Sequence, residues 1–189
     1  MGDISMKNTT KFVSVVTFLV AVGALVGVTA LGQGERIKTE VKEVPVGAYA
    51  PKQPIDYSHK LHAGDLQIEC QNCHTYARRS RSAGIPALEQ CMQCHVLIAA
   101  DRDPIKKIAE AYEKKEAIEW VKVHDLPDFV YFDHSRHIKA GFDCQTCHGP
   151  VEEMELLYRH APLTMGWCVN CHRDNLDKGA SLDCLTCHK

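Results

Sequence analysis

Hydrophobic residues are spread very unevenly along the chain. The longest apolar run, FVSVVTFLVAVGALVGVTAL at residues 12–31, holds twenty residues without a charge, about the length of a helix that crosses a bilayer. Lys7 and Lys11 precede it, and positive charge before a first span keeps the N-terminus in the cytoplasm. The pattern predicts a cytoplasmic segment 1–11, a transmembrane anchor helix 12–32 in the inner membrane and an extracytoplasmic, periplasmic remainder.

A cleaved signal peptide is the alternative interpretation of this run. Val28-Thr29-Ala30 supplies the small residues of a cleavage site. The run is longer than the usual apolar core of a signal peptide, so we interpret it as a retained anchor.

The chain after the anchor shows little regular periodicity. Three prolines in VPVGAYAPKQPI predict that residues 33–56 form an extended tether. One helical pattern follows, DPIKKIAEAYEKKEAIEW at 103–120, with Asp103 as the expected N-cap and Pro104 at the first helical position. Its apolar face consists of Ile105, Ile108 and Tyr112.

All ten cysteines fall in Cys-x-x-Cys pairs, and histidine follows each pair. This is the signature of covalent haem c attachment: two thiols one helical turn apart bond to the two vinyl groups of one porphyrin, and the histidine is the proximal iron ligand. The sequence therefore predicts five haems. The attachment residues are Cys70, Cys73, Cys91, Cys94, Cys144, Cys147, Cys168, Cys171, Cys184 and Cys187. The proximal ligands are His74, His95, His148, His172 and His188.

Zinc ribbons and disulfides also use paired cysteines. Neither requires histidine after every second cysteine, and a thioredoxin-like redox motif would occur once beside a βαβ pattern.

With 24 acidic and 22 basic residues the chain has no basic footprint for nucleic acid. We expect the haems themselves to supply much of the core, because covalent attachment can take the place of a conventional one in short loops.

An internal repeat divides the soluble part. IDYSHKLHAGDLQIECQNCH (55–74) aligns with VYFDHSRHIKAGFDCQTCH (130–148): each has an aromatic residue, a His-x-x-His pair and then the cysteine motif. The expected organisation is a di-haem module 57–96, a helical linker 97–128 and a tri-haem module 129–189.

FDHSRH before CQTCH resembles the class III multihaem cytochromes of the c3 and c7 type, and residues 129–189 are most similar to the three-haem c7 form. The resemblance implies a fold of mostly short α-helices and loops around the haems. It also implies distal ligands: His134 for the haem of Cys144/Cys147, His137 for that of Cys168/Cys171 and His160 for that of Cys184/Cys187. By the same pattern His59 serves Cys70/Cys73, and His62 serves Cys91/Cys94.

The first module departs from this pattern, because it lacks both a third cysteine motif and a counterpart of His160. His124 is left over, and we interpret it as a hydrogen-bonding partner of a propionate or the backbone, with axial ligation as the alternative. Met92, Met154 and Met165 are further candidate axial ligands, although packing against porphyrin is the simpler role for them.

Two histidines on every iron would leave no open position for a substrate, so we expect an electron conductor and not an enzyme with its own substrate site. WVKVHDLPDFVYFDHSRH and LTMGWCVNCHR, together with five haems and one N-terminal anchor, resemble the pentahaem cytochrome subunit of alternative complex III, a bacterial quinol-oxidising complex. That resemblance implies as partners an iron-sulfur subunit, polytopic quinol-binding membrane subunits and a mono-haem cytochrome. It implies electron flow from menaquinol towards a periplasmic cytochrome c or copper protein.

Two other functions stay open. A freestanding membrane-anchored quinol dehydrogenase would have to supply its own quinol site near the membrane, and the tether, which has no haem motif, disfavours this. A pentahaem reductase such as nitrite reductase commonly replaces the histidine of one motif by lysine, whereas all five motifs here end in histidine.

Overall fold

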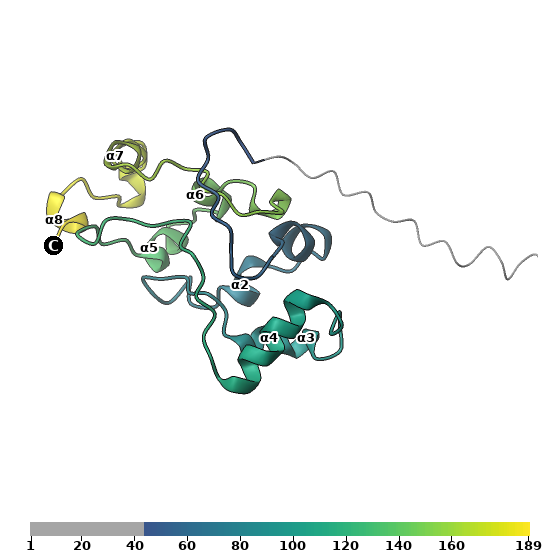
Figure 1. Ribbon diagram of the computed structural model, residues 1–189. Helices are drawn as coiled ribbons and strands as arrows, with labels where there is room; N and C mark the ends of the chain where they lie inside the picture. Colours follow the sequence, from purple (N-terminus) through teal and green to yellow (C-terminus); the bar gives the residue numbers. More distant parts are fainter. Residues whose placement is uncertain (1–43) are drawn as a thin grey trace, which may run out of the picture. The chain divides into compact units, whose positions relative to one another are not determined.

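Short helices joined by long irregular loops make up the part of the chain that the computed structural model describes, residues 44–189 (Figure 1). They are η1 (a π-helix, Lys60–Asp65), α2 (Cys70–Cys73), α3 (Leu88–His95), α4 (Asp103–Lys114), α5 (His134–Lys139), α6 (Gln145–His148), η2 (Val151–Glu153), α7 (Met165–Asp174), η3 (Leu176–Lys178) and α8 (Cys184–Cys187). These residues contain no strand, only an isolated antiparallel bridge between Val130 and His188. The expectation of a helical fold with little regular structure is confirmed for them.

The predicted anchor 12–32, with residues 1–11 and the first part of the tether, lies outside the described residues. From residue 44 onward, no helix is long and apolar enough to cross a membrane. The described end of the tether, residues 44–56, is non-helical, and a turn closes from Ala48 N to Pro45 O at 3.0 Å.

Helix α4 occupies only the first part of the predicted segment 103–120: it begins one residue earlier than predicted and ends at Lys114. Arg102 takes the N-cap position with extended backbone angles, and Asp103 is the first helical residue. Asp103 pairs with Lys106 at 3.4 Å, and an acidic residue in the first turn is favourable to the helix dipole. Ile108 is buried, and α4 packs against α3, which carries the second cysteine motif (Figure 1).

The protein core is thin. Within residues 44–189 the buried apolar side chains, each 3–6% exposed, are Ile55, Ala77, Ile108, Val123, Met154 and Ala161. Large apolar side chains such as Leu97 remain mostly exposed. A chain that buries so little of its own apolar surface needs another source of packing, which fits the expectation that haem supplies it.

Backbone contacts join the two predicted modules. Lys60 N donates to Met154 O at 2.9 Å, and Ser135 N donates to Ser80 O at 3.2 Å. A Cβ at Gly64 would overlap the carbonyl oxygen of Glu152, so glycine permits the close approach of η1 and η2. The predicted modules 57–96 and 129–189 therefore lie within a single compact unit of the described residues.

Candidate haem-binding sites

Each of the five cysteine pairs lies on a single helical turn, in α2, α3, α7 and α8 and at the start of α6. Two turns are capped by side chains: Thr164 Oγ1 accepts from Trp167 N at 3.3 Å, and Asp183 Oδ1 accepts from Leu185 N at 3.0 Å. Residues three apart on a helix share a face. The two thiols of each pair therefore point to the same side, as attachment to one porphyrin requires.

Disulfides and a zinc site are the alternative arrangements for these thiols. All ten cysteines are described, and no disulfide joins any of them. Across residues 44–189 no group of three or more histidine, cysteine, aspartate or glutamate side chains is placed to hold a metal ion, as a zinc ribbon would need. A haem with two axial protein ligands needs a facing pair of residues instead, and the predicted pairs here are histidines.

Backbone carbonyl groups hold the rings of three proximal histidines. The Nδ1 atom lies 2.6 Å from Gly84 O in His74, 2.9 Å from Ile98 O in His95 and 2.6 Å from Ser181 O in His172. A carbonyl oxygen can only accept, so Nδ1 carries the proton and Nε2 is left with its lone pair for a metal.

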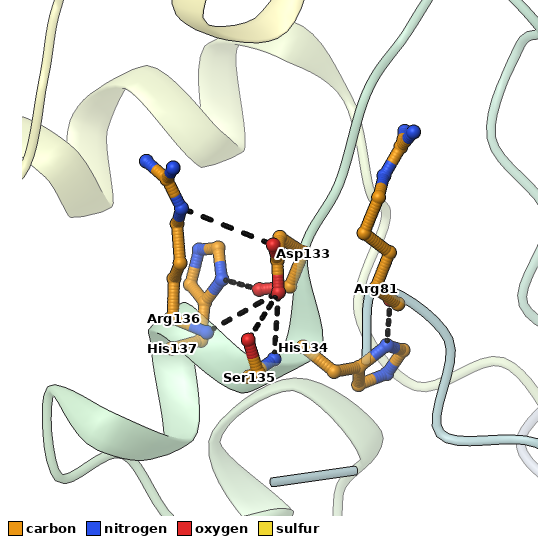
Figure 2. Close-up of polar contacts among 6 residues, drawn as sticks. All are labelled: Arg81, Asp133, His134, Ser135, Arg136 and His137. Atoms are coloured by element: carbon orange, nitrogen blue, oxygen red, sulfur yellow. Dashed lines mark hydrogen bonds and ion pairs between the residues drawn. The ribbon is translucent and has the colours of Figure 1, made fainter. Parts of the chain in front are cut away.

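Three of the predicted distal histidines are held in the same way. His62 Nδ1 donates to Ser58 O at 2.9 Å, His134 Nδ1 to Arg81 O at 2.9 Å and His137 Nδ1 to Asp133 O at 2.8 Å. Figure 2 shows the last two, which lie on successive turns and point away from each other. Each ring therefore presents Nε2 to a different site.

Three of the five predicted axial pairs face each other. Ring centroids are 6.1 Å apart in His62 and His95, 6.3 Å apart in His134 and His148, and 6.1 Å apart in His137 and His172. At this spacing the two rings of each pair would leave room for one iron atom between them, so each pair could hold the iron of one haem. The residues present fit haem at these three sites.

The other two predicted pairs are His59 with His74 and His160 with His188. Burial and then the neighbouring His74 lower the pKa of His59 to about 4, and His59 Nδ1 is buried without a hydrogen bond. The exposed His160 ring lies against Gly149, where a Cβ would overlap it. The His188 ring stacks on Phe129 at 5.8 Å. Both assignments stay predictions.

One aromatic ring positions each His-x-x-His pair. Tyr57 stacks on His62 with centroids 4.6 Å apart and meets His59 edge-on at 4.9 Å. Phe132 does the same at 4.4 Å from His137 and 4.7 Å from His134. Burial raises the pKa of Tyr57 to about 12, so its hydroxyl is neutral at pH 7.

His124 contacts a predicted proximal ligand. Its Nε2 lies 3.3 Å from His148 Nδ1, and the two rings meet edge-on with centroids 4.3 Å apart. Burial, then Arg159 and His134, lower the pKa of His124. The predicted propionate or backbone partner of His124 stays a prediction, and the contact with the side chain of His148 is one that the sequence did not indicate.

The methionine candidates divide by exposure. Met154 is 3% exposed and packs in the core, whereas Met165 is 69% exposed at the start of α7. At the three sites described above, two histidine rings already lie about 6 Å apart, a spacing that could hold one iron, so a methionine ligand would not be required there.

The cysteine pairs follow one another in space. Burial raises the pKa of the Cys70, Cys73, Cys147 and Cys168 thiols, and in each case a cysteine of another pair adds to the shift. These neighbours are Cys144, Cys94, Cys171 and Cys187 respectively. Thiols of neighbouring sites therefore lie close enough to interact, and these contacts link the motifs in the order that begins at Cys91 and continues with Cys70, Cys144, Cys168 and Cys184.

Sequence reasoning missed the groups that orient the rings. The carbonyls of Ser58 and Asp133 each lie four residues before a distal histidine, at matched positions of the repeat. The repeat is the signal that could have found them. The carbonyls of Arg81 and Gly84 come from a loop without a pattern, and no signal in the sequence identifies them.

Comparison with known families accounts for both modules. Residues 130–189 match the family of cytochrome c7 and related cytochrome c, and residues 35–126 match the class III cytochrome C family. These are class III multihaem cytochrome c domains. Covalently bound haem c is the cofactor of such domains, and electron transfer is their function.

One relative is similar over most of its length. It is the multihaem cytochrome c subunit of menaquinone reductase from Nitratidesulfovibrio vulgaris, 28% identical over 170 residues, which cover 77% of this chain and 81% of the relative. This multihaem cytochrome c is thus related to the cytochrome subunit of a menaquinone reductase.

Proposed function

We propose that the protein is a membrane-anchored pentahaem cytochrome c that conducts electrons within a quinol-oxidising complex of the alternative complex III type. Electrons from menaquinol would pass towards a periplasmic cytochrome c or copper protein. The proposed neighbours are an iron-sulfur subunit, polytopic quinol-binding subunits and a mono-haem cytochrome. The haem region would lie on the periplasmic side of the inner membrane.

The observation that carries this proposal is the row of five sites with histidine on both sides of three of them. Bound haem supplies one-electron chemistry at its iron. The chain keeps neighbouring sites adjacent, because both histidines of a His-x-x-His pair lie on one short segment and face different sites. Paired imidazoles leave no coordination position for a substrate, which favours conduction over catalysis.

The relative favours a second direction of flow. Its name describes a menaquinone reductase, so a chain of the same kind could deliver electrons to menaquinone instead of receiving them from menaquinol. Paired histidine ligation suits either direction, because it sets the coordination of the iron and not the identity of the donor.

Purification from native membranes in mild detergent tests the proposal. We expect mass spectrometry to find a large iron-sulfur subunit and polytopic membrane proteins, and we expect a menaquinol analogue to reduce the haems. If menaquinone oxidises the haems of the complex but menaquinol cannot reduce them, electrons flow in the reverse direction, towards menaquinone. Isolation of the protein alone, still reducible by menaquinol, would support a freestanding dehydrogenase instead.

A further inference from the structure

His124 lies in a segment that is held in place by contacts outside the haem motifs. Gln53 Nε2 donates to Val121 O, and Val121 N donates to Gln53 Oε1, both at 2.9 Å. Val123 is 5% exposed. The position of the His124 ring beside His148 is therefore set by the packing of residues 121–123 against the tether.

The contact differs from those of the other haem-site histidines. Six of them, His62, His74, His95, His134, His137 and His172, direct Nδ1 to a backbone carbonyl. His148 Nδ1 instead faces an imidazole nitrogen of another side chain at 3.3 Å. An imidazole nitrogen is a more basic acceptor than an amide oxygen.

The geometry separates this role from axial ligation at the same iron. His124 approaches the Nδ1 edge of His148 with centroids 4.3 Å apart, whereas His134 lies 6.3 Å away with its ring inclined by only 9°. His134 therefore has the spacing of the opposite ligand. The Nε2 atom through which His124 would bind another iron is already engaged by His148.

A proton count assigns the direction of the hydrogen bond. Iron binding through Nε2 leaves the proton of neutral His148 on Nδ1, so Nδ1 donates. His124 Nε2 must then accept, which requires its own proton on Nδ1.

We propose that His124 is a positioning residue that accepts the Nδ1–H of His148, orients that ring and makes it a stronger electron donor to the haem iron. The proposal rests on the ligation of haem by His148 proposed above. Hydrogen bonding to the outer nitrogen of a ligating histidine raises its basicity. A more basic ligand favours ferric iron, so His124 holds the potential of this haem below the value that a carbonyl partner would give.

Two substitutions isolate the acceptor. His124→Phe keeps an aromatic ring and removes the acceptor, and His124→Gln offers an amide oxygen like the partners of the other six histidines. Asp125→Asn is the matched control, because it alters the neighbouring exposed ion pair with Lys122. Potentiometric titration of the purified holoprotein should show one haem with a raised midpoint potential in the Phe variant and a smaller rise in the Gln variant. The midpoint potentials of the Asp125→Asn control should equal those of the unaltered protein.

Spectroscopy on the unaltered protein keeps the test independent of how the variants fold. Nitrogen-15 NMR of the reduced holoprotein should place a proton on His148 Nδ1 that is hydrogen-bonded to His124 Nε2. Absence of that bond, or unchanged potentials in a fully loaded Phe variant, would overturn the proposal. A new high-spin haem in that variant would also overturn it, by making His124 an axial ligand. None of these measurements needs a quinol or a partner protein, so they stand apart from the test of electron conduction.

Discussion

The two His-x-x-His segments share a pattern but differ in how they are supported. In the second, Asp133 caps α5: its Oδ1 accepts from Ser135 N at 2.9 Å, from Ser135 Oγ at 2.7 Å and from Arg136 N at 3.4 Å (Figure 2). In the first, Ser58 Oγ accepts only from Leu61 N at 3.0 Å, and the following turns are a π-helix.

The first histidine of each segment differs as well. His134 Nδ1 donates to Arg81 O, which belongs to the other module, whereas His59 Nδ1 is buried without a partner. The comparison teaches that the local pattern sets where the two rings point. Contacts from elsewhere in the fold decide how firmly each ring is held.

Removing a central attachment site should have the largest effect. Cys144→Ala with Cys147→Ala removes the third motif, whose thiols adjoin those of the first and fourth motifs. We expect loss of one haem and, because packing between the halves depends on this site, a large loss of Soret circular dichroism. Mass spectrometry gives the haem count.

The matched change at the end of the row is Cys91→Ala with Cys94→Ala. It should also remove one haem, yet leave most of the Soret dichroism, because only the first motif adjoins it. Equal losses in the two double variants would contradict the order of the sites.

Replacing a distal histidine should have the next largest effect. His137→Ala and His62→Ala each remove one ring of a facing pair. We expect one high-spin haem in each variant, with the others low-spin, by electron paramagnetic resonance. An entirely low-spin spectrum in either variant would show that its pair is wrongly assigned.

The difference in capping predicts a smaller effect on stability. Asp133→Ala should lower the free energy of unfolding by about 1 kcal/mol, the usual cost of losing an N-cap. Ser58→Ala should cost less, because Ser58 satisfies one backbone N–H and Asp133 satisfies two. Guanidinium titrations of the holoproteins followed at the Soret band measure both, and a larger loss for Ser58→Ala would reverse the comparison.

The smallest effect is expected where the modules are most alike. Tyr57→Phe places in the first module the residue that the second has at Phe132. Since the stacking on His62 uses the ring alone, the free energy of unfolding should change by less than about 0.5 kcal/mol. Tyr57→Leu, which removes the stack, should cost about 1 kcal/mol. Equal losses in the two variants would assign a role to the hydroxyl.

Much of the candidate site could be predicted because it is local in sequence. Cys70 and Cys73 share a turn, and His62 follows Ser58 by four residues, so helical geometry alone relates them. Apolar spacing predicts a helix at 103–120, and the structure has one that begins one residue before the predicted first turn and ends at Lys114. The facing of His137 with His172 came from the family resemblance, since 35 residues separate them and no spacing rule relates them.

The sequence by itself determined the chemistry of this protein: ten thiols in five haem motifs, and histidines in a repeated pattern. Covalent attachment and ring direction follow from contacts within a few residues. Only the tertiary structure decided the partner of each Nδ1 atom, the order of the sites and the contact between His124 and His148. These depend on loops that approach one another across long stretches of chain, and such approaches are set by packing rather than by any local preference.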